Sequence, residues 1–403
     1  MAEKSETWEE DDREEDFRKT GQTREEDFRK TGQTCYNREK ESNDNGNVFD
    51  CAFHPTRPLL ACGLSNGSIR LFQGPDADAP FDRWTIDDRF RLDYASHIKC
   101  LAWNVDGTRL AAGCFDGTVA VWQCNGVDDS VIPFQAKEHN LAVFEIIWNR
   151  WNCNLFATRS RDEGELQRIL TWNSDLNEPV SCQCLELDTK FVWDFEWISS
   201  TRMAACTYEG TILICEIGSK VPVRRVSHPG VWKVRWHFAL HYLVSCSTDG
   251  SVKVWSKNRH QEVGQIQLEN RIYCVDCHGL RSGGSALIAS GLEDGTIAIW
   301  HVTENRLQIL SEHLDAVTCI SFSPDGQYLA TLDNEEKLII WSTENWVIIF
   351  HHFKPANENW NHIRWNPTSN KLAISSNSHE IHIIELEDEF EDCISSHDEE
   401  KST

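Results

Sequence analysis

The chain repeats one short pattern of apolar and polar positions. Its clearest copy spans residues 243–255 and reads LVSCSTDGSVKVW. An apolar run is followed by the turn residues Thr248-Asp249-Gly250, and then by a second run in which apolar residues alternate and end on Trp255. Asp-Gly between two such runs is a strong hairpin signal, because glycine tolerates a positive φ and the resulting turn matches the twist of the strands. The pattern therefore predicts two antiparallel strands joined by a tight turn.

Seven further copies follow the same plan. The closest are LAAGCFDGTVAVW at 110–122 and LIASGLEDGTIAIW at 287–300, whereas the copy that ends at residue 172 carries extra residues in its turn. The last strand residues of the eight copies are Phe72, Trp122, Trp172, Cys215, Trp255, Trp300, Trp341 and Ile384. Successive markers lie 50, 50, 43, 40, 45, 41 and 43 residues apart. This spacing identifies the copies as internal repeats.

Each copy is preceded by another short strand pattern, and the ends of these strands are Phe53, Trp103, Trp148, Trp197, Trp236, Cys277, Phe322 and Trp365. A histidine stands before several of them, at His97, His139, His228 and His313. Repeats of about 40–45 residues with this content resemble the WD40 family, in which each repeat is one blade of a propeller. The resemblance covers about 340 of the 403 residues. It implies an all-β fold, a single eight-bladed WD40 β-propeller.

The two ends of the chain differ from the repeats. Residues 1–46 are dense in charge and contain a perfect tandem duplication, REEDFRKTGQT at 13–23 and at 24–34. Low hydrophobicity predicts disorder there, and we take 1–46 as a charged segment, 47–387 as the propeller and 388–403 as an acidic tail. Phe17 and Phe28 occupy the same position in the two copies of the duplication. They either mark a weak docking motif or are part of a solvated tail. Three stretches compete to close the ring: 33–37, the residues just before Val48, and 390–395.

Charge and composition narrow the class of partner and the compartment. The chain has 64 acidic and 39 basic residues, for a net charge of −25. This argues against direct nucleic-acid binding, which requires basic residues, and favours basic protein partners. No apolar run is long enough for a membrane span, and the acidic start is not a signal peptide, so no membrane association is expected. The 16 cysteines are therefore expected to be reduced, in the cytosol or nucleus.

Several irregularities of the repeats resemble the transducin-β-like-1 (Ebi) family of corepressor subunits. They are the eight copies, the fourth copy ending on Cys215 and followed by Ile217-Gly218, a Gly/Ser-bearing insertion in the sixth blade, and the stretch SFSPDGQYLAT at 321–331. The resemblance implies a nuclear, non-enzymatic subunit of a histone deacetylase complex that holds histone tails. The chain departs from the family at its start, because residues 1–46 lack the apolar periodicity of the family's helical dimerisation (LisH) and F-box-like segments.

Candidate partner-binding residues follow from the direction of the inner strand, which in WD40 blades begins at the top of the ring. The residue four before each first-strand marker then lies at the mouth, and the residue before each turn acid faces the same side. Aromatic residues and arginine, the types enriched in binding hot spots, dominate this set. The alternative is that these aromatics only pack between blades. The candidates are Trp193, Trp232, Phe144, Tyr273, Phe115, Arg161, Tyr208 and Phe49.

The turn acids Asp116, Asp249 and Asp294 are expected to be structural. Buried polar groups need partners, so these carboxylates are predicted to bond histidine and tryptophan side chains or turn amides.

Catalytic and metal chemistry find little support in the sequence. Cys274, Cys277 and His278 match a haem-attachment spacing, but Cys274 and Cys277 fall on opposite faces of a strand, and no second ligand pair suits zinc. There is no phosphate-binding loop or nucleophile elbow. We therefore expect no enzyme activity, no cofactor and no metal. The competing functions are a substrate receptor of a ubiquitin ligase, whose usual Trp-Asp-x-Arg signature is absent, and a cytoplasmic assembly scaffold.

Overall fold

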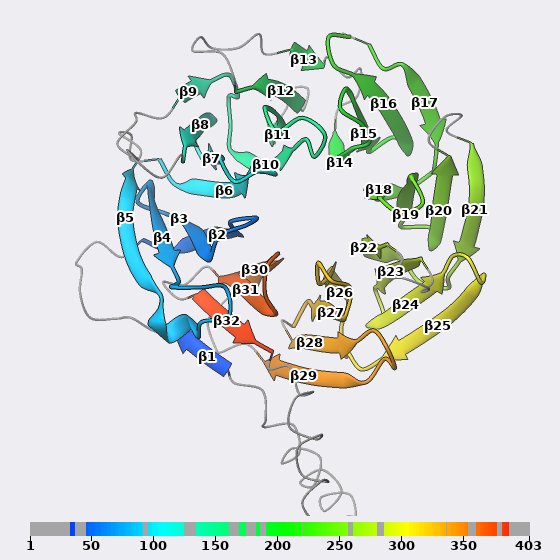
Figure 1. Ribbon diagram of the computed structural model, residues 1–403. Coiled ribbons are helices and arrows are strands. Elements are labelled where there is room, and N and C mark those ends of the chain that lie inside the picture. The colour runs from blue at the N-terminus through cyan, green and yellow to red at the C-terminus, as the bar shows by residue number, and fades with distance from the viewer. Residues whose placement is uncertain are drawn as a thin grey trace, which may run out of the picture.

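Strands dominate the computed structural model, which describes residues 33–36, 46–91, 96–124, 134–160, 169–174, 183–185, 191–219, 221–256, 261–279, 286–335, 337–353, 360–376 and 381–386. They form eight four-stranded antiparallel sheets arranged in a ring (Figure 1). In each sheet, one edge strand lies next to the central axis and the other edge strand lies at the rim. The predicted all-β fold and the count of eight blades are confirmed.

In the first four blades, the strands follow one another along the chain from the axis to the rim. Blade one contains β2 (Val48–Phe53), β3 (Leu59–Leu64), β4 (Ser68–Gln73) and β5 (Thr85–Arg91), with the short 3-10 helix η1 (Phe81–Arg83) before β5. Blade two contains β6 (Ile98–Trp103), β7 (Arg109–Cys114), β8 (Thr118–Gln123) and β9 (Phe134–Lys137). Blade three contains β10 (Val143–Trp148), β11 (Leu155–Ser160), β12 (Ile169–Asn173) and β13 (Gln183–Leu185). Blade four contains β14 (Val192–Trp197), β15 (Arg202–Thr207), β16 (Thr211–Glu216) and β17 (Arg224–Ser227).

The last four blades continue the ring. Blade five contains β18 (Val231–His237), β19 (Tyr242–Ser247), β20 (Ser251–Ser256) and β21 (Glu262–Gln267). Blade six contains β22 (Ile272–His278), β23 (Leu287–Leu292), β24 (Thr296–His301) and β25 (Arg306–Ser311). Blade seven contains β26 (Val317–Phe322), β27 (Tyr328–Asp333), β28 (Lys337–Ser342) and β29 (Ile348–Phe353). Blade eight contains β30 (Trp360–Trp365), β31 (Lys371–Ser376), β32 (Ile381–Glu385) and β1 (Gln33–Tyr36).

The strand β1 closes the ring. It pairs antiparallel with β32, with Gln33 opposite Ile384 and Tyr36 opposite Ile381. Of the three stretches left open by the sequence, the structure thus selects 33–37. The strand lies inside the charged 1–46 segment, so blade eight takes its outer strand from that segment.

The predicted hairpin joins β19 to β20, and its glycine shows why the repeat needs this residue. Gly250 has φ 84°, a conformation that side chains with a Cβ rarely adopt. A Cβ at this position would lie 2.4 Å from the carbonyl oxygen of Leu268. Leu268 directly follows β21, the outer strand of the same blade. Backbone conformation and crowding therefore both require glycine in this turn.

Tryptophans at the ends of four inner strands join blades two, three, four and eight to the blade before each of them. The indole N–H of Trp103 donates to the carbonyl of Ala52 at 3.1 Å, and that of Trp148 donates to the carbonyl of Ala102 at 2.9 Å. Trp197 and Trp365 donate in the same way to Ile147 and Ser321. Each of these rings is nearly buried in the apolar layer between two blades. The aromatic marker of the repeat thus serves packing and polar pairing together.

The histidine that opens several repeats belongs to a buried network within its own blade. In blade five, His228 Nδ1 is bonded to Ser245 Oγ at 2.7 Å, and the indole N–H of Trp255 donates to the same hydroxyl at 2.7 Å. His139 with Thr158 and His313 with Thr331 repeat this arrangement in blades three and seven. The strand hydroxyl between histidine and tryptophan was not singled out from the sequence.

The free energy of unfolding is expected to fall as the pH is lowered, because of buried neutral histidines. Burial, aided by Lys253, lowers the pKa of His228 from 6.5 to about 4. The unfolded chain then binds the proton more readily than the folded one between these values, so acidification through this window favours unfolding. From about pH 7 to about pH 5, this residue is expected to remove roughly 1–2 kcal/mol of stability. Urea unfolding of the wild type and of His228→Gln at both pH values tests this, since the variant should lose less; an equal loss in both would contradict it.

Parts of the sequence predictions lie outside the described residues. These are Arg161, the widened turn of blade three, most of the 1–46 segment and the 388–403 tail. Among the helices of the described residues, none has the length and apolar character needed to cross a membrane.

Candidate functional site

Every inner strand begins with a β-bulge, and the extra residue is the one predicted to lie at the mouth of the ring. The register shifts between Val192 and Asp194 in blade four and between Val231 and Lys233 in blade five, which leaves Trp193 and Trp232 without a ladder partner. The same shift occurs in the other six blades, at Phe49, Lys99, Phe144, Tyr273, Thr318 and Asn361. A bulge re-aims the side chain of its extra residue. The residue before each bulge is buried, whereas Trp193 and Trp232 are half-buried.

Blades four and five carry a compact aromatic platform, which consists of Phe191, Trp193, Tyr208 and Trp232. The ring centroids of Trp193 and Trp232 lie 4.4 Å apart at an interplanar angle of 33°. Tyr208 lies 5.9 Å from Trp193, and Phe191 lies 6.1 Å from Tyr208. Tyr208 is 66% exposed, whereas Trp193 also packs in part on the core between these blades. The structure thus brings three predicted residues together. Phe191, which was not predicted from the sequence, directly precedes β14 and lies two residues before Trp193.

Blades one to three carry a second group that already contains a cation. The ammonium of Lys99 lies 4.9 Å from the ring centroid of Phe49 and 5.9 Å from that of Phe144. Phe115 is 60% exposed and lies 6.0 Å from the ring of His97. Because Lys99 occupies the space over both phenylalanine rings, this group differs from the open platform of blades four and five. The predicted aromatic residues of blades one to five therefore form two groups rather than one continuous lining.

Tyr273, in blade six, is held within its own blade. Its hydroxyl donates to Glu293 Oε1 at 3.0 Å, and Glu293 is also 3.8 Å from the guanidinium of Arg271. The neighbouring turns add negative charge to this side of the ring through Glu209, Asp249, Glu293 and Asp294. These carboxylates lie in the turns between the second and third strands of blades four, five and six, on the same side of the ring as the platform.

The turn acids bond within their own turns. Asp249 accepts hydrogen bonds from the backbone N–H of Ser251 at 2.8 Å and from its hydroxyl. Asp116 accepts equivalent bonds from Thr118, and Asp294 from Thr296 and from the Asn270 side chain. Burial raises the pKa of Asp249, but the hydrogen bonds from Ser251 outweigh it and hold the pKa below its usual value. The carboxylate that bonds a histidine is Asp333 of blade seven, at 2.9 Å from His313.

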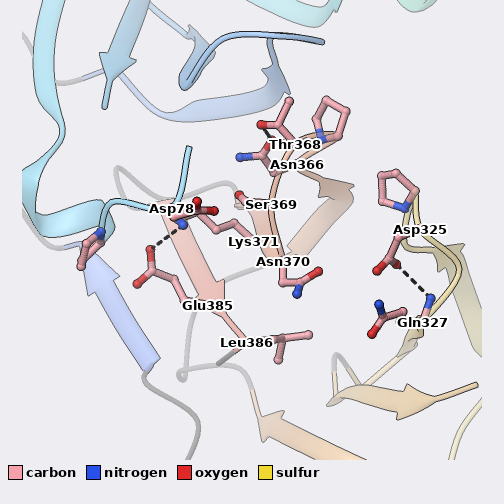
Figure 2. Close-up of a pocket in the computed structure, with 13 residues that line it drawn as sticks. Asp78, Asp325, Gln327, Asn366, Thr368, Ser369, Asn370, Lys371, Glu385 and Leu386 are labelled. Atoms are coloured by element: carbon pink, nitrogen blue, oxygen red, sulfur yellow. Dashed lines mark hydrogen bonds and ion pairs between the residues drawn. The ribbon is translucent and has the colours of Figure 1, made fainter. Parts of the chain in front are cut away.

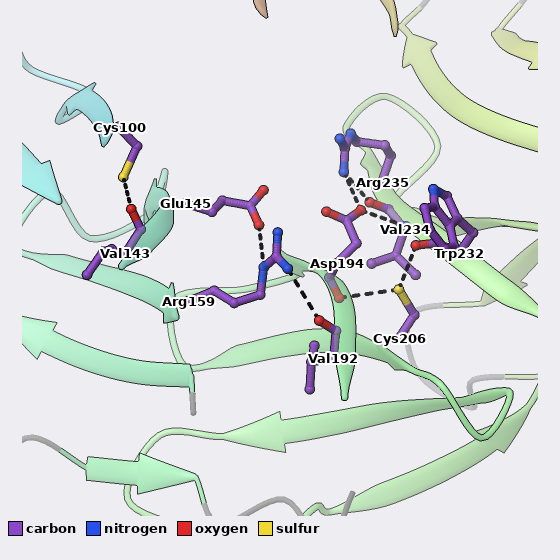
Figure 3. Close-up of polar contacts among 10 residues, drawn as sticks. All are labelled: Cys100, Val143, Glu145, Arg159, Val192, Asp194, Cys206, Trp232, Val234 and Arg235. Carbon is purple, nitrogen blue, oxygen red and sulfur yellow. Dashed lines mark hydrogen bonds and ion pairs between the residues drawn. The ribbon is translucent and has the colours of Figure 1, made fainter. Parts of the chain in front are cut away.

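Two ion pairs and the hydrogen bonds beside them join blades three, four and five (Figure 3). Arg159 pairs with Glu145 at 2.9 Å and donates to the carbonyl of Val192 in the next blade at 3.4 Å. Asp194 accepts from the backbone N–H of Val234 at 3.0 Å and from the guanidinium of Arg235 at 2.7 Å. These bonds fix the strands that carry Trp193 and Trp232, so the platform rests on a rigid support.

A titratable carboxyl group lies deeper in the same region. Burial raises the pKa of Glu196 to about 7, while Arg235 opposes the shift and Asp194 adds to it. Among the described residues, no group of three or more His, Cys, Asp or Glu side chains is placed to hold a metal ion.

The architecture defines a class of protein, the eight-bladed β-propellers. A family model described as "WD domain, G-beta repeat" matches residues 36–73, 90–123, 220–256 and 304–342. Each match covers the first three strands of one blade, namely blade one, two, five or seven, together with part or all of the outer strand of the blade before it. The chain is therefore a WD40-repeat propeller with eight blades. WD40 propellers are generally non-catalytic scaffolds.

Known proteins add relatives at low identity. The chain is 23% identical over 296 residues to the F-box-like/WD repeat-containing protein TBL1X of Mus musculus, a match that covers 70% of this chain and 54% of that protein. The chain thus spans about half the length of the curated relatives it matches. The solved C-terminal WD40 domain of Sif2 superposes with a TM-score of 0.70 at 17% identity, covering 86% of this chain and 98% of that one. Chaetomium thermophilum Sqt1, solved bound to the N-terminus of ribosomal protein L10, superposes with a TM-score of 0.67 at 14% identity, covering 85% and 98%.

Proposed function

We propose that the chain is a non-enzymatic scaffold that binds a basic peptide segment of a partner protein on the platform of blades four and five. The observation that carries the proposal is the pair Trp193 and Trp232, set out of the ladder by bulges and left half-exposed beside Tyr208. Tryptophan and tyrosine are the residue types that dominate binding hot spots. The carboxylates of the neighbouring turns and a net charge of −25 favour a cationic partner.

The shape of the platform specifies the kind of cation. Lys99 shows how an ammonium lies between two rings of this protein, at 4.9 and 5.9 Å from their centroids. Trp193 and Trp232 are in mutual contact at 4.4 Å and leave no such slot between them. A half-exposed pair of indole rings of this kind suits the planar guanidinium of arginine, which stacks on aromatic faces. We therefore infer that arginine, rather than lysine or methylated lysine, is the principal anchor.

A peptide titration tests this function and its selectivity. Basic histone-tail peptides are expected to bind with micromolar affinity that weakens as salt rises. Replacement of the peptide's arginines by lysine is expected to weaken binding about five- to tenfold, because stacking is lost while charge is kept. Equal binding of the arginine and lysine peptides would contradict the platform geometry, and binding of an acidic peptide of equal length would contradict the proposed partner class.

The wider setting of the proposal is a nuclear corepressor complex that contains histone deacetylase. It rests on the family resemblance of the repeats and on the similarity to TBL1X and Sif2. That Sqt1 binds the N-terminus of a ribosomal protein supports the capacity of a propeller of this shape to hold a peptide segment. Recovery of deacetylase activity with the tagged chain from its own cells is the corresponding test.

A further inference from the structure

The face of the ring opposite the platform has a cavity of about 600 Å³, lined by residues of blades one, seven and eight (Figure 2). The ammonium of Lys371 in its wall donates to the carbonyl of Ala77 at 3.1 Å and lies 3.8 Å from Glu385. Asp325, on the opposite wall, accepts from the backbone N–H of Gln327 at 2.9 Å. These charged groups are satisfied within the fold and give no sign of a ligand.

The residues that follow the bulges of the inner strands lie at one level around the central axis. The bulges align the eight strands, because each register shift passes over one residue and the pairing resumes at the next. This level is one residue further along the strand than Trp193 and Trp232 of the platform. In the order of the blades, its residues are Asp50, Cys100, Glu145, Asp194, Lys233, Cys274, Cys319 and His362.

The charges at this level divide the ring into two halves. The three carboxylates belong to blades one, three and four, and each is paired with an arginine (Figure 3 shows the second and third pairs): Asp50 with Arg364 at 3.7 Å, Glu145 with Arg159 at 2.9 Å, and Asp194 with Arg235 at 2.7 Å. Blades five to eight place no acid at this level, although blade five places a lysine there. The second half of the ring thus carries a cation with no carboxylate beside it at the same level.

The ammonium of Lys233 is this cation. In the part of the chain that the structure describes, it takes part in no hydrogen bond and no ion pair. The side chain is half-buried and directly follows Trp232. Lys99, in blade two, differs because its ammonium lies over the rings of Phe49 and Phe144. A partly desolvated charge without a partner is unfavourable, so an anion beside Lys233 would be stabilising.

The surroundings of His362 show the same excess of positive charge. Burial lowers the pKa of His362 from 6.5 to about 4. The positive charges of Arg364 and Lys233 contribute to this shift, whereas Asp50 opposes it. The half-buried imidazole is therefore neutral at pH 7 and has one N–H to donate to an anion.

We propose that Lys233 and His362 bind a carboxylate of the same peptide whose arginine lies on the platform. The inference rests on the proposed function and specifies the partner, a basic segment with a glutamate or aspartate close to its arginine anchor. One free ammonium and one neutral imidazole match the single negative charge of a carboxylate better than the nearly doubled charge of a phosphate.

The sign of the effect of an acidic residue in the peptide is diagnostic. The protein carries a net charge of −25, and the carboxylates of the turns of blades four to six lie on the side of the platform. Without a cation to receive it, an acid in the peptide would weaken binding. The proposed site predicts tighter binding instead.

A set of peptides with one arginine tests the inference by isothermal titration. Each carries glutamate in place of glutamine at one of the three positions on either side of the arginine. For the wild type, the best of these is expected to bind about three- to fivefold more tightly than the all-glutamine peptide, the upper range for a partly exposed ion pair. Lys233→Gln is expected to abolish this gain without weakening the binding of the all-glutamine peptide. Lys233→Arg is expected to keep most of the gain, and His362→Phe to reduce it to about twofold.

The matched control is Lys99→Gln, which removes the same charge from the other aromatic group. It is expected to change the gain by less than about twofold, because Lys99 lies over Phe49 and Phe144. Thermal unfolding of each variant shows that it is folded at the temperature of the titration.

The outcomes separate this inference from the proposed function. If the all-glutamine peptide binds but glutamate brings no gain at any position, or if Lys99→Gln removes the gain as fully as Lys233→Gln, the inference fails and the platform function stands. Tighter binding of phosphoserine than of glutamate at the best position would overturn the assignment to a carboxylate. Failure of the all-glutamine peptide to bind the wild type would contradict the proposed function, and the inference with it.

Discussion

Replacement of Asp194 by alanine is expected to lower the free energy of unfolding by about 3–5 kcal/mol, the cost of breaking a buried ion pair by removing one partner. Asp194 is 4% exposed and accepts two bonds from blade five, from the backbone N–H of Val234 and from Arg235. The variant leaves the guanidinium without its closest anion and the N–H without an acceptor. Chemical denaturation at neutral pH measures the effect.

The control for this experiment is Asp116→Ala. Asp116 is an acid of the same charge, but it lies in a partly exposed turn, where its carboxylate accepts hydrogen bonds from Thr118 and pairs with Lys137. It is expected to cost about 1 kcal/mol. If Asp194→Ala is no more destabilising than Asp116→Ala, then the ion pairs beneath the platform do not hold blades four and five together.

The double variant Trp193→Ala/Trp232→Ala is expected to weaken the binding of an arginine-rich peptide by about 30-fold or more, since hot-spot truncations cost 2 kcal/mol or more. The two rings form the contact surface of the platform, at 4.4 Å from one another. Isothermal titration of the wild type and the variant with the same peptide measures the loss.

Two controls separate binding from folding in this variant. Trp193 packs in part on the core, so thermal unfolding must show that the variant remains folded at the temperature of the titration. Lys99→Ala changes the other aromatic group, over Phe49 and Phe144, and is expected to leave the affinity within about twofold, because it lies outside the proposed contact. A larger loss with Lys99→Ala than with the double variant would place the peptide on blades one to three instead.

The periodic part of the fold was predictable from the sequence because each blade is a local unit. The turn around Gly250 and the alternation up to Trp255 specify one hairpin, and eight copies specify eight blades. The closing strand was not decided in advance, since three stretches competed and only the pairing of β1 with β32 selects one. Such pairing joins residues about 350 positions apart, beyond the reach of local patterns.

The candidate site was predictable in composition but not in arrangement. Counting back from the aromatic markers found Trp193 and Trp232, yet strict alternation gives no sign of the bulge that turns them out of the ladder. The separation of Lys99, Phe49 and Phe144 from the platform depends on side-chain directions across blades. The network of His228, Ser245 and Trp255 was likewise hidden, because a serine inside a strand carries no distinctive signal.

The most direct test of the central proposal is purification of the tagged wild-type chain and of the Trp193→Ala/Trp232→Ala variant from the cells that make it. The eluates are compared for histone deacetylase activity, for co-purifying subunits and for retained histone-tail peptides. Deacetylase and corepressor subunits with the wild type, and loss of histone-tail binding by the folded variant, are the predicted result. Recovery of cullin-type ligase subunits or of cytoplasmic assemblies, without deacetylase activity, would contradict it.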